Sequence, residues 1–343
     1  MDEMRQVWIA APERVEVRTA PRPVPGPGEV LVETAHVGIC GSDLHALHGR
    51  HPFIDLPVSP GHEATGVVAA VGDGVEVFAE GDRVLVEPNL ICGLCTYCTS
   101  GRYNLCAQLR VVGCQTAGAM ADAFTVPAHR LHPVPEQFSW AAAAMVEPLS
   151  TATHATRLVG DLGGASVAVL GAGSIGLVTL LAARAAGAAA VAVTDPVPVK
   201  RERARAFGAD LTVDPLRDDA VAHIRQGLPY RPDVVFDCVA NQSSTDQAIG
   251  LAVKGGTVVV VGVPQGPVTI PLEVVQDREV RLQGTAMYTG EDVRAAIGLV
   301  TDGAPVEQLV TATFPLEAAA EAFAAASSGE HVKVHLQAGA AMS

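Results

Sequence analysis

A glycine-rich turn between an apolar strand and a helix constrains the fold of this 343-residue chain more than any other feature. The turn spans residues 171–176, directly follows the strand-like run Val167–Leu170 and opens a helical stretch. In this context glycines allow a tight turn, close approach of the backbone to a pyrophosphate and close helix packing. We therefore expect Gly171, Gly173 and Gly176 to bind a dinucleotide, with its phosphates at the helix N-terminus.

Strand-like and helical segments alternate around this turn. Further apolar runs begin at Ala190, Asp233 and Thr257, and Ala- and Leu-rich helical stretches separate them. Parallel strands that are buried on both faces have this uniformly apolar composition. The pattern predicts a doubly wound parallel α/β sheet, the Rossmann fold.

Asp195 ends the strand that follows the glycine-rich turn, 19 residues after Gly176. An acidic side chain here accepts hydrogen bonds from the adenosine ribose and repels a 2′-phosphate, so NAD is favoured over NADP. Two alternatives remain open. Asp195 could merely cap the segment ahead of Pro196, and the neighbouring Lys200 and Arg201 could accommodate a phosphate.

The first 150 residues have a different pattern. Between Val30 and Val86, short β-rich runs are interrupted by Gly and Pro, which is typical of a compact, barrel-like β domain. Near the C-terminus, helical stretches over residues 292–300 and 316–326 lead to a last strand-like run at 332–336.

Four cysteines in the β-rich part have the spacing of a metal site. Four thiolates this close together suit one tetrahedral zinc. The chain has seven cysteines, and an odd total with four clustered favours metal ligation over disulfides in a reducing compartment. The four are Cys92, Cys95, Cys98 and Cys106.

A second metal site has candidate ligands far apart in the sequence: Cys40, His62, Glu63 and Glu147. Catalytic zinc keeps three protein ligands and one open position. Because these ligands meet only if the fold brings them together, their spacing does not prove a site, and a lone Cys or His also occurs in ordinary packing.

Composition excludes several classes of protein. The formal charge of −14 opposes binding to nucleic acid. The mean hydropathy is +0.29, but the apolar stretches are interrupted before they reach bilayer-spanning length, so we expect no membrane insertion. The acidic start of the chain lacks a secretory signal pattern, which favours the cytoplasm.

Motifs along nearly the whole chain together resemble one family. They are Gly38-Ile-Cys40-Gly-Ser-Asp43, Gly61-His-Glu63, Gly101-Arg-Tyr-Asn-Leu-Cys106 with the cysteines before it, Glu147-Pro-Leu149 and the turn at 171–176. The chain is similar to zinc-containing medium-chain dehydrogenase/reductases, in the branch of sorbitol (L-iditol 2-) and threonine dehydrogenases. This implies a GroES-like catalytic domain over residues 1–150, completed by 287–343, and a Rossmann domain over 151–286.

The resemblance also implies two zinc ions per subunit. Cys40, His62 and either Glu63 or Glu147 would hold the catalytic zinc, and the four clustered cysteines a structural zinc. Ser42 and His45 match a relay that passes the substrate proton through the cofactor ribose to an imidazole, and Asp43 would support a ligand imidazole such as that of His62. The implied contacts to NAD are Gly171, Gly173, Ile175, Gly176, Asp195, Lys200, Val261, Gly262, Val263, Ala286, Met287 and Tyr288.

The implied reaction is hydride transfer between a secondary alcohol, such as a polyol, diol or sugar-like compound, and NAD, which gives the ketone. Ala46 stands where sorbitol dehydrogenases have a substrate-contacting tyrosine, and Met287 replaces an arginine, so a less hydroxylated substrate is expected. The alternatives are an L-threonine 3-dehydrogenase-like activity and a non-catalytic zinc- and nucleotide-binding protein. Relatives associate through edge strands of the Rossmann sheet, here residues 280–285, so a homodimer or homotetramer is expected. The ligand set argues against a zinc-free quinone or enoyl reductase.

Overall fold

The computed structural model describes residues 2–217 and 219–339, which fold into two compact units. The first unit comprises residues 1–147 and 305–343, and the second comprises 148–304. The first division lies close to the expected one at residue 150. The return to the first unit comes at Pro305, later than the expected 287, because helix α10 (Gly290–Thr301) is tied to the second unit by ion pairs to α4 (Val146–Val159).

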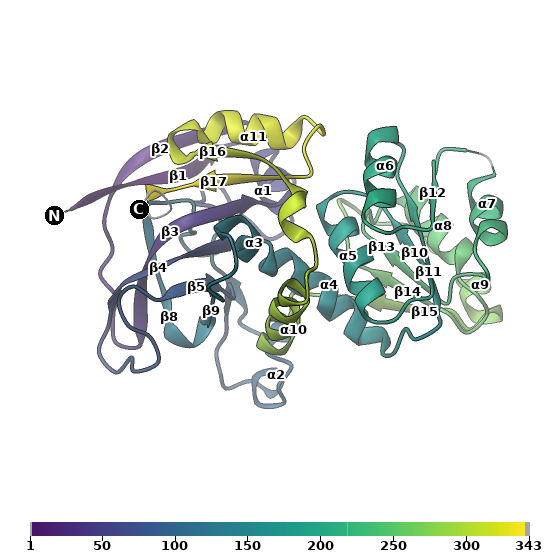
Figure 1. The fold of residues 1–343 in the computed structure, drawn as a ribbon, viewed down its shortest axis with the longest axis horizontal. Coiled ribbons are helices and arrows are strands. Elements are labelled where there is room, and N and C mark those ends of the chain that lie inside the picture. Colours follow the sequence, from purple (N-terminus) through teal and green to yellow (C-terminus); the bar gives the residue numbers. More distant parts are fainter. Residues whose placement is uncertain (1, 218, 340–343) are drawn as a thin grey trace. The chain divides into compact units, whose positions relative to one another are not determined.

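The first unit is built on a seven-stranded sheet that joins the N-terminal and C-terminal parts of the chain (Figure 1). The strand order is β16-β17-β3-β4-β5-β9, and β8 also pairs with β3. The β16–β17 pair is parallel and the other pairs are antiparallel. The strands are β3 (Glu29–Ile39), β4 (Glu63–Val71), β5 (Arg83–Val86), β8 (Ala123–Pro127), β9 (Leu131–Pro133), β16 (Val310–Pro315) and β17 (Lys333–Gln337).

Smaller elements complete this unit. They are the hairpin β1 (Glu3–Ala11) and β2 (Arg14–Pro21), the pair β6 (Asn89–Leu90) and β7 (Arg110–Val111), helices α1 (Gly41–Leu47), α2 (Thr96–Thr99), α3 (Trp140–Ala144) and α11 (Ala319–Ser327), and short 3₁₀ turns at Tyr103–Leu105, Ala128–Arg130, Val306–Leu309 and Leu316–Ala318. One apolar cluster, mainly Val, Leu and Ala, forms the core and includes residues from both parts of the chain, such as Val32 and Leu336.

The second unit has a six-stranded sheet, and all of its pairs are parallel. The order β12-β11-β10-β13-β14-β15 reverses between β10 and β13, which is where doubly wound sheets bind nucleotides. Every residue of β10 and β11 is buried, as the apolar runs predict. The strands are β10 (Ser166–Leu170), β11 (Ala190–Thr194), β12 (Leu211–Val213), β13 (Val234–Asp237), β14 (Thr257–Val260) and β15 (Arg281–Gly284).

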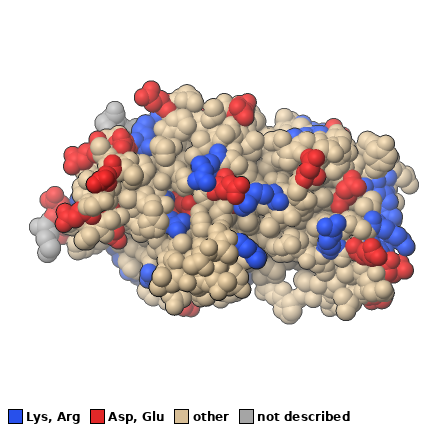
Figure 2. All heavy atoms as spheres, turned by 90° about the horizontal axis from the view of Figure 1, so that it is seen from below, with Lys and Arg blue, Asp and Glu red and all other residues tan. Residues whose placement is uncertain are grey.

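Helices connect these strands, as a parallel sheet requires (Figure 1). In addition to α4 and α10, they are α5 (Ser174–Ala185), α6 (Pro198–Ala206), α7 (Ala220–Gly227), α8 (Gln242–Leu251) and α9 (Leu272–Asp277). No helix in the described part of the chain is long and apolar enough to cross a membrane. On the face drawn in Figure 2, basic and acidic side chains are interspersed, with no continuous basic surface of the kind that nucleic-acid binding needs.

Candidate functional site

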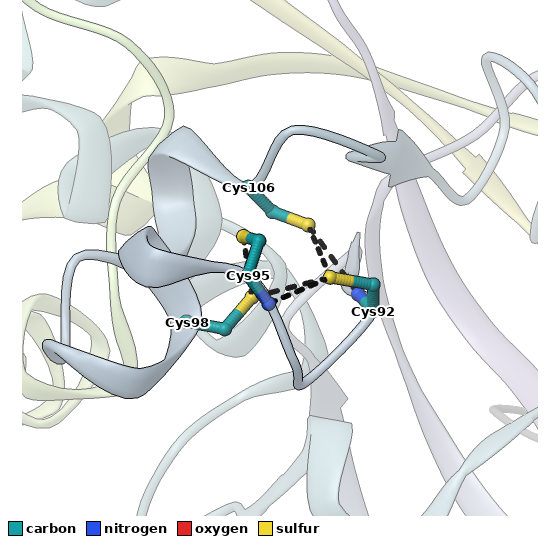
Figure 3. Close-up of side chains that lie close together, drawn as sticks. All are labelled: Cys92, Cys95, Cys98 and Cys106. Atoms are coloured by element: carbon teal, nitrogen blue, oxygen red, sulfur yellow. Dashed lines mark hydrogen bonds between the residues drawn. The ribbon is translucent and has the colours of Figure 1, made fainter.

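The four clustered cysteines lie in a small lobe around α2, and their side chains point toward a common centre (Figure 3). The Cys92 sulfur is 3.9 Å from that of Cys98 and 3.5 Å from that of Cys106, and the Cys95 and Cys98 sulfurs are 3.5 Å apart. Four sulfurs bonded at ~2.3 Å to a tetrahedral zinc lie about 3.8 Å from one another. The cluster therefore fits a zinc ion whose four coordination positions are all occupied by cysteine sulfurs.

Backbone N–H groups favour thiolates in this lobe. Those of Ala107 and Cys98 lower the pKa of the Cys95 thiol to about 6. The N–H of Cys92 is 3.3 Å from the Cys106 sulfur, and that of Cys95 is 3.4 Å from the Cys92 sulfur. Burial and the neighbouring Cys95 and Cys106 thiols instead raise the pKa of Cys98 to about 12. A thiolate is the form that binds the metal, so the backbone prepares Cys95 for it.

The candidate ligands Cys40, His62 and Glu63 meet at one place in the first unit. One ligand atom from each lies within 4.8 Å of the other two, although the residues come from different elements. Cys40 is the N-cap of α1, Glu63 is the first residue of β4, and His62 directly precedes that strand. His62 and Glu63 are 6% and 0% exposed, so this is a buried site of soft and hard donors.

The side chains of α1 surround the imidazole of His62. The hydroxyl of Ser42 lies 3.4 Å from His62 Nε2. Asp43 accepts a 2.9 Å hydrogen bond from the Cys40 backbone N–H, and its other oxygen faces His62 Nδ1 at 3.9 Å, beyond hydrogen-bonding distance. Burial lowers the pKa of His62, but Asp43, Cys40 and Cys114 together raise it well above its usual value. Electrostatics at this imidazole therefore favour a bound cation.

Glu63 has a partner that sequence reasoning did not identify. The ammonium of Lys333 on β17 lies 2.7 Å from both carboxylate oxygens and 3.3 Å from the carbonyl oxygen of Ile39. A Cβ at Gly38 would lie 2.0 Å from Glu63 Oε2, so only glycine leaves room for this carboxylate. Burial lowers the pKa of Lys333, but Glu63 and Cys40 raise it above its usual value. A single lysine in the apolar run at 332–336 is the signal that could have predicted a buried carboxylate partner.

Two other predicted residues lie nearby. Glu147, in the first turn of α4, is 8% exposed and is close enough to Lys333 to raise its pKa, but it is outside the three-residue cluster. His45 lies one turn after Ser42 on α1, where burial and then His48 and Arg50 lower its pKa. Ala46 is 2% exposed and belongs to the apolar core.

Cys114, a cysteine outside both candidate ligand sets, lies near the metal cluster. Its side chain interacts with that of His62. Gly113 places it there: this glycine has φ +79°, and a Cβ on it would lie 2.6 Å from the carbonyl oxygen of Gly61. Cys238, the other remaining cysteine, lies in the second unit, where burial raises the pKa of its thiol to about 12.

The glycine-rich turn in the second unit has the predicted shape. Gly171 has φ +95°, and a Cβ on Gly176 would lie 1.9 Å from the Gly171 carbonyl oxygen, so both positions require glycine. Gly173 is the N-cap of α5, and open space lies where its Cβ would be. Ile175 is in the first turn of α5. The turn thus presents open backbone at a helix N-terminus, the geometry that holds a pyrophosphate.

Asp195 lies directly after β11 and is 6% exposed. One carboxylate oxygen accepts a 3.0 Å hydrogen bond from the Ala172 N–H in the glycine-rich turn, and the other accepts one of 2.9 Å from Val197. Each oxygen can accept a further bond. Lys200 is half-buried in the first turn of α6, two residues beyond its Pro198 start.

The later predicted cofactor contacts follow β14 and β15. The N–H groups of Val261 and Gly262 both donate to the Asp237 carbonyl oxygen at 2.9 Å, and Val263 is 44% exposed. Ala286 is exposed, and Met287 has φ +50°. Tyr288 is 1% exposed, one of the largest fully buried side chains among the described residues.

Comparison with known proteins gives the family. Residues 26–136 match the alcohol dehydrogenase GroES-like domain, and residues 174–302 match the zinc-binding dehydrogenase domain. Sorbitol dehydrogenase of Ovis aries is 35% identical over 337 residues, which cover 96% of this chain and 95% of that protein. The chain belongs to the zinc-containing medium-chain dehydrogenase/reductase family.

Solved structures agree with this assignment. 2R,3R-butanediol dehydrogenase from Bacillus subtilis superposes with a TM-score of 0.90 at 30% identity, covering 98% of this chain and 100% of that one. A zinc-binding dehydrogenase from Sinorhizobium meliloti 1021, solved with NADP, has a TM-score of 0.92 at 34% identity with the same coverage.

Membership of the medium-chain dehydrogenase/reductases confirms the predicted fold class, a GroES-like domain with a Rossmann sheet. It also confirms an oxidoreductase that acts on CH–OH groups and uses zinc and a nicotinamide cofactor. The donor atoms of both clusters fit zinc, since sulfur, imidazole nitrogen and carboxylate oxygen are its usual ligands.

Proposed function

We propose that this chain transfers a hydride between a secondary alcohol, such as a polyol, diol or sugar-like compound, and NAD, giving the ketone. The supporting observation is that Cys40, His62 and Glu63 converge within 4.8 Å while Ser42 lies 3.4 Å from the His62 ring. A protein that only stored zinc would have no need for a hydroxyl beside the ligand imidazole.

The side chains on α1 and around the start of β4 have different roles in the proposed reaction. Cys40 and His62 would hold the zinc, which would supply Lewis acidity and make a substrate hydroxyl easier to deprotonate. Ser42 is positioned to take that proton at its hydroxyl oxygen. His45 is half-buried, and burial lowers its pKa, so its imidazole is neutral near pH 7 and able to accept a proton.

Glu147 is the carboxylate that we propose as third ligand. Lys333 engages both oxygens of Glu63 at 2.7 Å, so a bond from Glu63 to zinc would compete with a buried ion pair. Glu147 is also buried, and its charge raises the pKa of Lys333. The 2.7 Å contacts of the Lys333 ammonium are with the two oxygens of Glu63.

Two arguments support the proposed substrate class: the substrates of the relatives, and two positions at which this chain differs from sorbitol dehydrogenases. The similar proteins include sorbitol and butanediol dehydrogenases, whose substrates carry adjacent hydroxyl groups. Ala46, at the position of a substrate-contacting tyrosine, is buried in the core, and Met287 has no hydrogen-bonding group. A pocket with fewer polar groups prefers substrates with fewer hydroxyls, so we favour a short diol or secondary alcohol over sorbitol.

NAD is the proposed cofactor because the Asp195 carboxylate is fixed beside the glycine-rich turn by the N–H groups of Ala172 and Val197. A 2′-phosphate at this position would face that negative charge. One similar structure was solved with NADP, so the preference has to be measured on this chain.

Two further proposals concern assembly and compartment. All four residues of β15, at the edge of the parallel sheet, are exposed, which supports a homodimer or homotetramer formed through this edge. Four of the seven cysteines cluster at one metal site, and this use of cysteine supports a reducing compartment such as the cytoplasm.

The first test combines zinc content with NADH and NADPH formation on sorbitol, xylitol, 2,3-butanediol and L-threonine. We expect two zinc ions per chain, at least tenfold higher kcat/KM with NAD than with NADP, and highest activity on a diol. Cys40→Ser should lose one zinc and all activity. The matched variant Cys92→Ser should lose the other zinc from the lobe.

Other results would change the proposal. Highest activity on L-threonine would favour the threonine dehydrogenase alternative. Two zinc ions in Cys40→Ser, with no turnover of any substrate by the wild type, would contradict the catalytic site itself.

A further inference from the structure

The second unit contains a cavity of about 280 Å³ that the proposed reaction does not use. Arg201 and Arg205 of α6 line it, together with Asp214 and Arg217 from the segment after β12 and His223 of α7. One water occupies roughly 30 Å³ in the liquid, so this space holds a small polyatomic ion and its hydration waters.

The lining carries an excess of positive charge. Three guanidinium groups face one carboxylate, and that carboxylate, on Asp214, lies 3.7 Å from Arg201. Arg217 pairs with Asp219 at 2.9 Å, outside the lining. The guanidinium of Arg205 makes no hydrogen bond or ion pair with the described residues, and this side chain is exposed at the rim. One guanidinium is therefore uncommitted, and its fork of N–H donors matches the oxygens of a phosphate.

A buried hydroxyl in the same lining lacks a partner. Thr212 on β12 is 7% exposed, and its Oγ1 makes no hydrogen bond with any part of the chain that the structure describes. Leaving a buried hydroxyl unsatisfied costs about 1–3 kcal/mol, so such a group is unusual without a ligand or water to satisfy it. An ion bound in the cavity would accept this O–H.

The cavity adjoins the proposed nucleotide site. The Arg201 guanidinium donates to the carbonyl oxygens of Asp195 at 2.7 Å and of Pro196 at 2.9 Å. Arg201 therefore lines the cavity and also contacts the backbone of Asp195, the residue expected to bind the adenosine ribose.

We propose that this cavity is a binding site for a phosphate dianion, held by Arg205, Arg217 and the Thr212 hydroxyl beside the adenosine end of the cofactor site. The phosphate comes either from inorganic phosphate in solution or from the 2′-phosphate of NADP. Only the placement beside a nucleotide rests on the proposed function; binding of phosphate itself does not.

The test is calorimetric titration of the zinc-loaded enzyme with inorganic phosphate, without alcohol or nucleotide. We expect one site, with affinity at least tenfold weaker in Arg205→Gln and in Thr212→Val. The control is Arg294→Gln, which removes the same charge from an exposed position on α10 and should bind like the wild type. Thr212→Val should not lower the thermal stability of the phosphate-free protein, because it removes an unsatisfied hydroxyl.

Repeating the titration with nucleotide present separates the two sources. If the 2′-phosphate occupies the cavity, phosphate competes with NADP but not with NAD, and Arg205→Gln raises KM for NADP alone. If inorganic phosphate is the ligand, it binds equally well with NADP present. No heat of phosphate binding, or equal affinity in wild type, Arg205→Gln and Thr212→Val, overturns the proposal. Loss of turnover on every alcohol, with phosphate binding intact, would contradict the dehydrogenase function only.

Discussion

Lys333 and Glu63 form an ion pair with side chains that are 3% and 0% exposed, deep in the first unit. Burial makes each charge costly alone, and the pair is favourable only because both oxygens share one ammonium at 2.7 Å. At the scale of single residues, the carboxylate beside the proposed zinc is thus positioned by a lysine from the far end of the chain.

Replacing this lysine should destabilise the protein strongly. We expect Lys333→Met to lower the free energy of unfolding by about 3–5 kcal/mol, since Glu63 is left buried and unpaired. The measurement is urea denaturation of the zinc-loaded protein. The matched control is Lys254→Met, which breaks an exposed pair with Asp277 and should cost less than about 1 kcal/mol.

The double variant Lys333→Met/Glu63→Gln makes the test specific. It removes both charges, so it should recover part of the stability lost by Lys333→Met. A double variant that is less stable than Lys333→Met would show that Lys333 contributes through packing and not through the charge of Glu63.

At the scale of elements, helices α4 and α10 are joined by one carboxylate. Asp292, 1% exposed in the first turn of α10, accepts hydrogen bonds from Arg157 Nε at 2.7 Å and from the Thr289 N–H at 2.8 Å, and its Oδ2 lies 3.0 Å from His154 Nδ1. Burial alone would raise the Asp292 pKa, but His154, Arg157 and Thr289 lower it well below its usual value. The same carboxylate therefore caps one helix and anchors the other.

Asp292→Asn should weaken this junction in a pH-dependent way. A lowered pKa in the folded state stabilises the protein above the unfolded pKa, about 3.9, and this stability is lost as pH falls further toward the folded value. We expect Asp292→Asn to be less stable than wild type by about 2–4 kcal/mol at pH 7. The gap should be constant down to pH 5 and shrink below pH 4.

Chemical denaturation across pH 3.5 to 7 measures this gap. Glu291→Gln is the control on the same helix, because Glu291 is an exposed partner of the same arginine. Its effect should be below about 1 kcal/mol. A gap for Asp292→Asn that widens on acidification would contradict the assignment of the charge to Asp292.

At the scale of the whole molecule, sequence reasoning found what is encoded locally. The strand before Gly171, the helix after it and the cysteine loop each lie within about 20 residues, so their pattern could be recognised without knowing the fold. The Lys333–Glu63 pair joins residues 270 positions apart, and Asp292 meets His154 across 138. A lone lysine in the apolar run at 332–336 indicates that it has a buried acidic partner, but no local pattern identifies Glu63 as that partner. Neither the orphaned Thr212 hydroxyl nor the Cys114 contact could be predicted before the chain was folded.

The two units are proposed to bind different ligands, and hydrogen exchange should distinguish the effect of each ligand. Both metal clusters lie in the first unit, and the glycine-rich turn lies in the second. Zinc stabilises the segment whose backbone it fixes, and NAD stabilises the segment that it contacts. We therefore expect chelation to speed exchange mainly in residues 90–112 and around Cys40 and His62, and NAD to slow exchange mainly in 171–177 and 195–201.

Mass spectrometry of peptides from the two units tests this in one experiment, with α7 as an internal reference that neither ligand is expected to touch. Because exchange reports local opening, the two effects should be separable even if the whole chain unfolds in one step. Protection by NAD confined to the first unit would contradict the nucleotide site. Faster exchange throughout both units on chelation would mean that bound zinc stabilises the entire molecule and not only the segments that hold it.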